Sequence, residues 1–259
     1  MDALAALRLQ MDWGADEALD ETPVDRLAPR APPAAAILLA EAASAAAPLQ
    51  PRPAAPQARA AAIAGAADTV EQLRAALAGF DGCGLSATAS HMVFADGAPS
   101  ASLMLVGDVP GDAEDRAGRP FVGPPGQLLD RMLASIGLDR TACLLTNLIP
   151  WRPPGNRTPT APEILLCLPF LLRHIALVRP RRLVLLGAIA TAALTGSNAG
   201  IRRMRGKWVP AAIPGLEAPV PALPMLHPAH LLRTPGAKRD AWADLRLLRH
   251  TLDADTAET

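Results

Sequence analysis

Three polar side chains of the kinds that bind ligands and move protons each follow a short apolar run of the sequence. They are the carboxylate of Asp108, the amide of Asn147 and the imidazole of His227. Each apolar run predicts a buried strand, and ligands of open α/β sheets bind beyond the carboxyl ends of parallel strands. The three side chains are therefore expected to converge on one pocket. The alternative is structural, since a lone histidine is usually structural and an asparagine before prolines usually forms a turn.

The chain is organised around residues 102–133, which contain the first of these strand ends. The apolar run 103–106 predicts a strand, and the tight turn GDVPG follows it. An acidic loop with several glycines then leads through Phe121 to a helix over 126–136 with its leucines on one face. Asp108 and Phe121 thus lie where a ligand is expected, although the loop alone is equally compatible with a structural βα turn.

The remaining globular part alternates strands with helices. Further strands are predicted over 143–151, 182–187 and 222–226, and further helices over 161–177, 188–194 and 238–252. A capping-box spacing marks the start of the 161–177 helix, Met92–Phe94 could form an edge strand, and Trp242 of the last helix is expected to face inward with its leucines. The alternation predicts an α/β fold, a three-layer αβα sandwich around a four-stranded parallel sheet.

Composition divides the chain into three parts. Residues 1–67 combine a short amphipathic helix over 2–12 with an Ala/Pro-rich flexible linker that lacks large apolar residues. Residues 68–252 form the globular domain, which begins with a helix capped by Asp68 or Thr69. Residues 253–259 are a tail.

The totals limit the class of protein. The chain has 259 residues, of which 50% are apolar, so a sizeable core is available. No run of about 18 apolar residues is free of charge, so we expect no membrane span, and the start lacks the pattern of a secretory signal. Three cysteines, Cys83, Cys143 and Cys167, cannot form a disulfide framework and fit a reducing cytoplasm. Abundant alanine and proline suggest a bacterial genome rich in GC.

Charge is distributed unevenly along the chain. Residues 1–145 carry 10 Lys/Arg and 18 Asp/Glu, whereas residues 146–249 carry 15 Lys/Arg and 4 Asp/Glu. The positive surplus of the second part predicts a surface that faces phosphates. The alternative is a solvated basic face.

Several segments occur in an order that resembles a known family. They are GDVPGDAEDRAGRPFVGPPGQLLDRML, TNLIPWRPPGNRTPTAPEILLCLPFL, RLVLLGAIA, RRMRGKW and LHPAHLLRTPGAKRDAWADL. Together they resemble the successive motifs of the uracil-DNA glycosylase superfamily, and they are most similar to its type-4, iron–sulfur branch. The resemblance runs from about residue 80 to 250. It implies a base-excision repair enzyme that flips uracil, or a related deaminated base, out of DNA and hydrolyses its N-glycosidic bond.

The resemblance also implies roles for residues of the pocket. Asp108 would position the attacking water, and His227 would hydrogen-bond uracil O2 as the uracil anion departs. Phe121 would stack on the flipped ring. Asn147 would pair with the uracil edge and reject cytosine, whose donor and acceptor are reversed. Gly107 and Val109 complete the base-binding set implied for this chain.

DNA contacts are implied by the same motifs. The stretch 228–233 would enter the minor groove, with Leu231 or Leu232 as the wedge that replaces the lost base. Phosphate contacts would come from Arg152, Arg233 and Lys238. The alternative is that Phe121 is a core residue and that the leucines simply start a helix. We expect a monomer that acts on DNA in the bacterial cytoplasm, at the nucleoid.

The sequence departs from the family at the turn after the first strand. Where the family has glutamate, this chain has Asp108, one methylene shorter. If this carboxylate positions the attacking water, its reach is shorter by roughly 1.5 Å. A misplacement of that order can lower a rate about 100-fold.

A second departure concerns the 4Fe–4S cluster of the type-4 branch, which is held by four cysteines. Two matching cysteines remain, Cys83 and Cys167, whereas Phe80 and Trp151 stand at the other two ligand positions. A cluster takes four thiolates or a substitute. We therefore expect no metal and no cofactor, with apolar packing in place of the cluster. The alternative is a cluster that survives on unorthodox ligands.

Two functional hypotheses follow from these features. The first is a uracil-DNA glycosylase without a cluster, and it rests on the retained residues Phe121, Asn147 and His227. The second is a catalytically weak or inactive nucleic-acid-binding protein on the same fold. It rests on the lost cysteines and on Asp108. A further hypothesis makes the N-terminal extension a tether to repair or replication partners.

Overall fold

The computed structural model describes residues 56–257 of the chain. Contacts divide the chain into residues 1–52 and a compact unit of residues 53–259, and the fold is that of the second unit. The helix expected over 2–12 and most of the expected linker lie outside the described residues.

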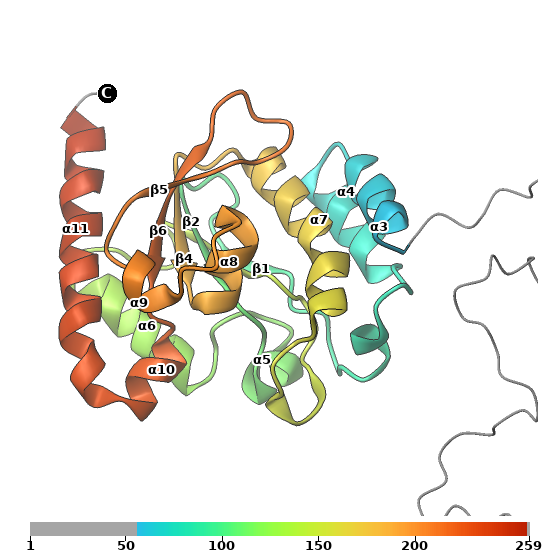
Figure 1. Cartoon of the computed structure of the whole chain (residues 1–259), viewed down its shortest axis with the longest axis horizontal. Coiled ribbons are helices and arrows are strands. Elements are labelled where there is room, and N and C mark those ends of the chain that lie inside the picture. Colours follow the sequence, from blue (N-terminus) through green and yellow to red (C-terminus); the bar gives the residue numbers. More distant parts are fainter. Residues whose placement is uncertain (1–55, 258–259) are drawn as a thin grey trace, which may run out of the picture. The chain divides into compact units, whose positions relative to one another are not determined.

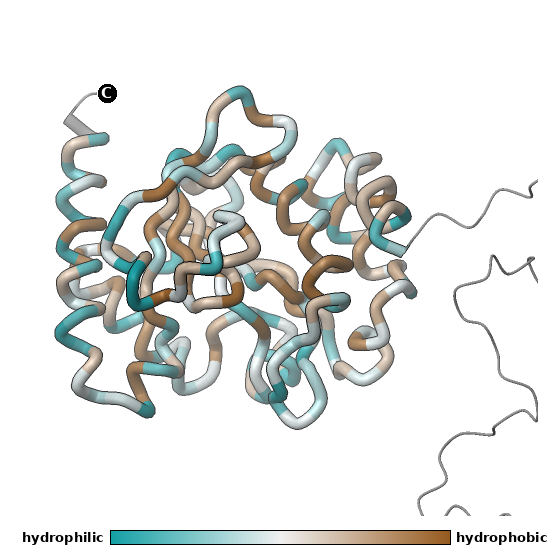
Figure 2. Tube along the Cα trace, in the orientation of Figure 1, coloured by the Kyte–Doolittle hydropathy of each residue, from teal (hydrophilic) through white to brown (hydrophobic). Residues whose placement is uncertain are grey.

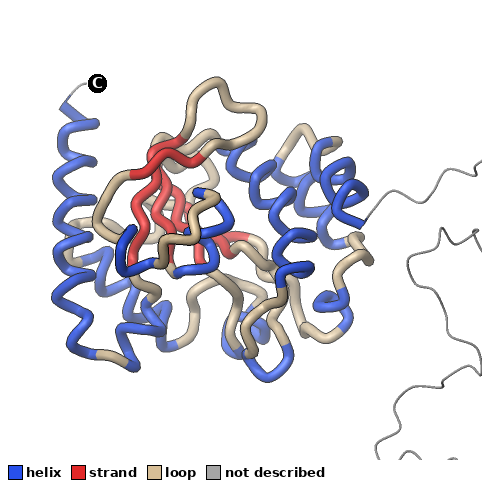
Figure 3. The backbone as a smooth tube through the Cα atoms, in the orientation of Figure 1, coloured by secondary structure: helices blue, strands red, loops and turns tan. Residues whose placement is uncertain are grey.

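A central sheet supports the domain (Figure 3). Its strands are β1 (Ala95–Gly97), β2 (Leu103–Gly107), β3 (Leu144–Asn147), β4 (Arg182–Leu186), β5 (Val209–Ala211) and β6 (Val220–Met225). Their order is β1-β3-β2-β4-β6-β5. The four inner strands are parallel, as predicted, and are aligned so that Gly107 pairs with Asn147 and with Leu186.

The sheet is nevertheless mixed, which corrects the prediction of four parallel strands. The short edge strands β1 and β5 pair antiparallel to the inner strands β3 and β6. The edge strand expected at Met92–Phe94 begins three residues later. Three-residue strands carry too little periodicity to be recognised in a sequence, because their pairing depends on the neighbouring strand and not on their own pattern.

Helices cover both faces of the sheet (Figure 1). The α-helices are α3 (Pro56–Gly65), α4 (Val70–Ala78), α5 (Asp112–Ala117), α6 (Pro124–Ala134), α7 (Ala161–Val178), α8 (Ala188–Thr195), α9 (Ile201–Met204), α10 (Pro228–Arg233) and α11 (Lys238–Ala257). Short 3-10 helices occupy Gly84–Ala87, Pro154–Asn156 and Pro235–Ala237. The helix α5 lies where the sequence predicts only an acidic loop.

Alternating residues of the buried strands divide the core into two layers. Met104 and Val106 of β2 pack with α3, α4 and α7, whereas Leu103 and Leu105 pack with α6, α10 and α11. Every residue of β2 is buried, so both of its faces are apolar, and Figure 2 colours much of the strand segments at the centre of the domain as hydrophobic. This is the three-layer arrangement that the sequence predicts.

The N-terminal boundary of the domain lies before residue 68. Residues 56–65, expected to be linker, form α3, which packs against α7 with Ala60 and Ala64 fully buried. Small side chains let two helices approach closely, so alanine-rich sequence can be core as well as linker. At the other end, α11 runs to Ala257, so the tail expected over 253–259 is largely helix, and Asp255 pairs with Arg182 of β4.

Helix α7 begins as the sequence predicts. The Thr160 side chain accepts from the Glu163 amide, and the Glu163 carboxylate accepts from the Thr160 amide at 2.7 Å. By length and composition α7 is apolar enough to cross a membrane. It contacts α3 and α4, and it buries Phe170, Leu171 and Ile175 in the core, as the core helix of a globular domain does.

Helix α11 departs from the prediction at one position. Leu245 and Leu248 are buried, as expected, and Leu252 is partly buried. Trp242, also expected to face inward, is 47% exposed. The apolar stripe of this helix therefore follows Ala241, Leu245 and Leu248, and Trp242 lies beside it.

Candidate functional site

The polar residues at the strand ends converge on one cavity of about 360 Å³. Asp108 follows β2, Asn147 ends β3, and His227 follows β6, and all three line the cavity together with Phe121. The parallel register of the inner strands brings these ends to one edge of the sheet. Val109 and Arg233 line the same cavity.

Gly107 lies against the side chains of Asn147 and Phe121. A Cβ added to this residue would lie 2.4 Å from Asn147 Oδ1 and 2.6 Å from Phe121 Cζ. No other residue type fits there without displacing the amide or the ring. Gly107 therefore allows Asn147 and Phe121 to close over the end of β2, and Asn147 itself is only 6% exposed.

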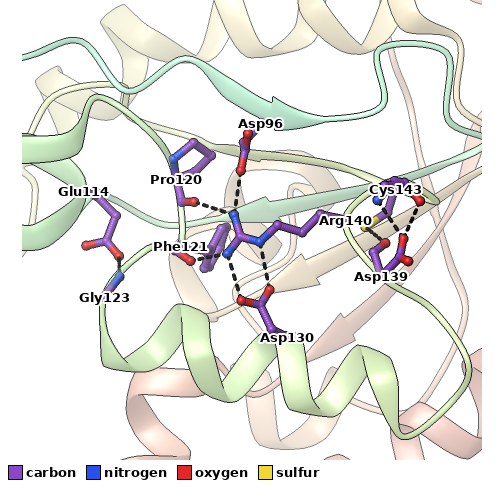
Figure 4. Close-up of polar contacts among 10 residues, drawn as sticks. Asp96, Glu114, Pro120, Phe121, Gly123, Asp130, Asp139, Arg140 and Cys143 are labelled. Carbon is purple, nitrogen blue, oxygen red and sulfur yellow. Dashed lines mark hydrogen bonds and ion pairs between the residues drawn. The ribbon is translucent and has the colours of Figure 1, made fainter.

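The backbone at Phe121 is held in a left-handed conformation, with φ of 55°. This conformation is unfavourable for a residue with a large side chain. The guanidinium of Arg140 donates to the carbonyls of Pro120 and Phe121 and also binds Asp96 of β1 and Asp130 of α6 (Figure 4). The arginine therefore ties the Phe121 turn to the sheet and to α6.

Gly126 is required by the same turn. A Cβ at Gly126 would lie 1.7 Å from the carbonyl oxygen of Phe121. Gly126, the last residue of the sequence GRPFVGPPG, thus allows α6 to pack closely against the turn that carries the aromatic ring. The Phe121 ring lies 6.0 Å from the imidazole of His227, centroid to centroid, with the two planes inclined by 29°.

Glu114 is a pocket residue that the sequence analysis missed. Its carboxylate is 8% exposed and accepts from the amide of Gly123 at 2.8 Å and from that of Gly111 at 3.1 Å (Figure 4 shows the Gly123 contact). It joins the turn after β2 to the start of α6, the two segments that carry Asp108 and Phe121. The only sequence signal was its place three residues after Gly111, which is capping-box spacing.

The carboxylate of Asp108 is fixed by the start of α8. Its Oδ1 accepts from the amide of Ala190 at 2.7 Å. Burial raises the pKa of Asp108 to about 6, although hydrogen bonds from the Ala190 and Ile189 amides act in the opposite direction. The carboxylate therefore ionises only near neutral pH, and the helix fixes its orientation.

His227 is held as a neutral ring with a defined tautomer. Its Nδ1 lies 3.1 Å from the amide nitrogen of Ala229, which can only donate, so Nδ1 accepts and the ring proton lies on Nε2. Burial, and to a smaller extent the charge of Arg233, lower the pKa of His227 to about 4. At neutral pH this residue can donate one hydrogen bond from Nε2 without carrying a charge.

A loop between β3 and α7 forms the outer wall of the cavity. Asn156, Arg157, Thr158 and Pro159 line it, and the sequence analysis assigned them no role. The Arg157 guanidinium binds both carboxylate oxygens of Glu163 at 2.6 and 2.9 Å. This ion pair holds the loop to the start of α7, where Glu163 also serves as the cap.

The residues expected to contact DNA lie in different environments. Leu232 is 41% exposed, whereas Leu231 is 1% exposed and belongs to the core, so Leu232 is the candidate wedge. Arg152 pairs with Asp112 at 2.9 Å, and its Nε donates to Asn156. Lys238 lines a groove separate from the base cavity, whereas Arg233 lines that cavity.

The residues at the expected cluster positions do not fit four-thiolate ligation. Cys83 and Cys167 hydrogen-bond to each other, which lowers the pKa of Cys83 to about 7 and, with burial, raises that of Cys167. Phe80 and Trp151 are both buried, and the Phe80 ring packs 5.1 Å from that of Phe170. Within residues 56–257 there is no group of three or more His, Cys, Asp or Glu side chains that could hold a metal ion.

Comparison with known proteins connects this pocket to a family. The family model described as "Uracil DNA glycosylase superfamily" matches residues 94–246. A type-4 uracil-DNA glycosylase of Pyrobaculum aerophilum is 36% identical over 182 residues, which are 69% of this chain and 92% of that protein. Proteins with the same description from Sulfurisphaera tokodaii and Thermotoga maritima are 34% and 36% identical, over 70% and 58% of this chain and 84% and 77% of their own lengths.

Proposed function

The chain belongs to the uracil-DNA glycosylase superfamily, and from this we propose that it is a DNA repair hydrolase that cleaves the N-glycosidic bond of uracil flipped out of DNA. A base within a duplex cannot reach a pocket at the end of a sheet, so the nucleotide must first leave the stack. The observation that carries the proposal is the convergence of Asp108, Phe121, Asn147 and His227 on one cavity.

Recognition of uracil is assigned to Phe121 and Asn147. The flipped ring stacks on Phe121, while the Asn147 amide accepts from uracil N3–H and donates to O4. Cytosine has an acceptor at N3 and a donor at position 4, so the same amide would face two unmatched groups. In a site this buried, unmatched polar groups are costly, and that cost excludes cytosine. Gly107 supports this reading because it lets the ring and the amide lie close together.

His227 is assigned to the leaving group. As the glycosidic bond breaks, negative charge develops on uracil O2, and the Nε2–H of a neutral imidazole donates to it. The acceptor role of Nδ1 toward Ala229 supports this assignment, because it leaves the proton on Nε2. A donor that is already oriented stabilises the developing charge without reorganisation during the reaction. Arg233 adds a positive charge near the same cavity.

Asp108 is assigned to the water and the sugar. Its ionised carboxylate orients the attacking water and opposes the positive charge that develops on the deoxyribose. The Ala190 amide donates to one oxygen of the carboxylate, and this contact supports a fixed orientation of the shorter side chain. The wedge is assigned to Leu232, and phosphate contacts to Arg152, Arg233 and Lys238.

The proposal includes activity without an iron–sulfur cluster. Two thiols and two buried aromatic rings at the expected ligand positions support it, because a cluster takes four thiolates. We also propose that the protein acts as a monomer in a bacterial cytoplasm, at the nucleoid.

A strand-scission assay tests the function. Oligonucleotides with a single uracil, hypoxanthine or xanthine, single-stranded and in duplex, are incubated with the protein and then heated in alkali. We expect scission at uracil and none at cytosine or thymine in matched oligonucleotides. Absence of scission at uracil, hypoxanthine and xanthine, in single strands and in duplexes alike, would refute the proposal.

The second candidate function, a nucleic-acid-binding protein without catalysis, is favoured by the two lost cysteines and by the departure at Asp108. It predicts salt-dependent DNA binding without release of a base. The substitution Asp108→Glu separates the two. An inert protein that gains activity on this change has lost catalysis through the shortened side chain, whereas an active wild-type protein rejects this candidate.

A further inference from the structure

The exposed tryptophan of α11 lies at the rim of a second groove, which we call the Trp242 groove. It has a volume of about 450 Å³, is lined by Leu128, Arg131, Leu231, Lys238, Trp242 and Leu245, and lies between α6, α10 and α11. These three helices lie side by side (Figure 1), and α6 contacts both of the others. Trp242 is 47% exposed although it is among the largest apolar side chains of the chain. The exposed ring and the mainly apolar residues of the groove form one continuous surface on which a ligand can pack.

Positive charge surrounds this ring. Lys238, Trp242 and Arg246 are spaced four residues apart on α11 and are all exposed, so they form one stripe along the helix. Arg131 of α6 lines the opposite side of the groove. None of these cations takes part in an ion pair within residues 56–257.

The acidic residues nearby are committed elsewhere. Asp130, next to Arg131 in sequence, binds Arg140, and both Asp240 and Asp244 of α11 bind Arg205. The surface around Trp242 therefore presents cations and an aromatic ring with no free carboxylate among these neighbours. Cations that follow a backbone of phosphates, with an aromatic ring on which a base can stack, are the features of a single-strand nucleic-acid site.

The groove adjoins the base cavity. Helix α10 separates them: Ala229 and Arg233 line the base cavity, while Leu231 lines the Trp242 groove. Leu232, the candidate wedge, is exposed on the same helix. A helix with its side chains is only about 10–12 Å across, so a short segment of a DNA strand can pass over α10 from one site to the other.

From these features we propose that the Trp242 groove is a second nucleotide site, in which an unpaired base that flanks the uracil stacks on Trp242. The phosphates of the DNA strand next to this base lie against Lys238 and Arg131. The proposal rests on the proposed function, since it assumes that the DNA strand enters at the neighbouring base cavity. It predicts that the protein binds a flanking nucleotide through stacking on its base as well as through contacts to its phosphates.

A base-deletion scan tests the proposal by binding alone. Single-stranded oligonucleotides carry one uracil on a 2′-fluoro sugar, which resists cleavage because the fluorine disfavours the positive charge on the sugar. An abasic tetrahydrofuran residue replaces the flanking nucleotides one at a time, which removes a base but keeps its phosphate. Dissociation constants are measured by fluorescence anisotropy at one fixed salt concentration. For the wild-type protein we expect one flanking position at which loss of the base weakens binding about 5- to 100-fold.

The same scan on variants assigns the effect to the ring. In Trp242→Ala the loss at that position should disappear, and Trp242→Phe should retain part of it. Leu165→Ala is the matched control, because Leu165 is 48% exposed but lies on α7, outside both sites. A wild-type scan that is flat at every flanking position overturns the proposal, as does a Trp242→Ala scan equal to that of the wild type. Either result would leave the groove available to a protein partner.

The outcome is independent of catalysis. If the protein does not cleave at uracil but the base-dependent loss requires Trp242, the nucleotide site stands and the proposed reaction fails. If the protein cleaves at uracil while the scan is unaffected by Trp242→Ala, the reaction stands and the nucleotide site fails.

Discussion

Asp108 combines two properties that act in opposite directions on the reaction. One oxygen of its carboxylate is held by the Ala190 amide, which orients the group toward the cavity. Burial, however, raises its pKa to about 6, so a substantial fraction is protonated in mildly acidic solution. His227 has a pKa of about 4 and stays neutral over the same range. The carboxylate alone should therefore set the acid limb of activity.

The rate of uracil release should fall as the pH drops through about 6, because only the ionised form of Asp108 orients the water. Below that pH the single-turnover rate should decrease about tenfold per pH unit. In Asp108→Asn the rate should be about 100-fold lower at pH 8, and the acid limb should be absent. A wild-type profile that stays flat down to pH 5 would contradict the assignment.

The raised pKa of Asp108 also determines the sign of the stability difference between the wild type and Asp108→Asn. The pKa of Asp108 is raised in the folded protein, so protonation of this carboxyl favours folding. Its contribution to the free energy of unfolding is fully present below pH 3.8 and is lost as the pH rises through about 6. Asp108→Asn, which cannot ionise, should therefore be more stable than the wild type at pH 8, by at most about 3 kcal/mol. The gain should vanish near pH 4 in denaturant titrations. An Asp108→Asn variant that is less stable than the wild type at pH 8 would show that the folded protein favours the ionised form of Asp108.

At the level of elements, Arg140 joins parts of the chain that are distant in sequence. It precedes β3, its partners Asp96 and Asp130 lie on β1 and α6, and it donates to the carbonyl of Phe121. A left-handed phenylalanine costs free energy that neighbouring contacts must offset. The arginine supplies those contacts, so the position of the stacking ring depends on it.

Arg140→Leu should weaken both the fold and the base pocket. It leaves two carboxylates and the Phe121 carbonyl without their donor, and about 2–4 kcal/mol of unfolding free energy should be lost. Uracil binding should weaken as the ring moves, measured by the KM for uracil oligonucleotides.

Arg140→Lys keeps the charge but loses the fork of donors, so its stability and its KM should lie between those of the wild type and of Arg140→Leu. Arg249→Leu removes an exposed pair with Asp253 and is the control, with a loss below about 1 kcal/mol. Unchanged uracil affinity in Arg140→Leu would exclude this role for the arginine.

At the level of the whole molecule, the region expected to hold a cluster is part of the larger hydrophobic layer. Phe80, Cys83, Trp151 and Cys167 belong to the same buried cluster as α3, α4 and α7. Apolar contact there connects α3 and α4 to α7 and to the sheet.

Protein purified from iron-supplied cells should accordingly be colourless and free of stoichiometric iron. The Cys83→Ala/Cys167→Ala variant should keep its uracil-releasing activity and lose only a few kcal/mol of stability from the smaller side chains. Phe80→Cys/Trp151→Cys, which restores four cysteines, is the converse variant, and iron binding by it would show that only the ligands were missing. A brown wild-type protein with about four iron atoms per chain would contradict apolar packing.

Much of the fold and of the pocket could be predicted because it depends on local pattern. The inner strands are continuous apolar runs, α7 has its capping box, and Asp108, Asn147 and His227 each lie at or just after the end of a strand. Glu114 could not be assigned, because its partners Gly111 and Gly123 meet only when two loops come together. Leu231 and Leu232 were equivalent in the sequence, and only burial separates them.

The sequence by itself therefore determined the four inner strands, the long helices α6, α7, α8 and α11, the residues at the strand ends and the similarity to the family, since each depends on types and spacing along the chain. Tertiary structure decided that alanine-rich residues 56–65 are core, that two short edge strands join the sheet, and that Trp242 faces solvent beside α10. It also decided the tautomer of His227 and the raised pKa of Asp108. The physical reason is that packing, burial and hydrogen-bond partners depend on groups that are far apart in the sequence and close only in the folded chain.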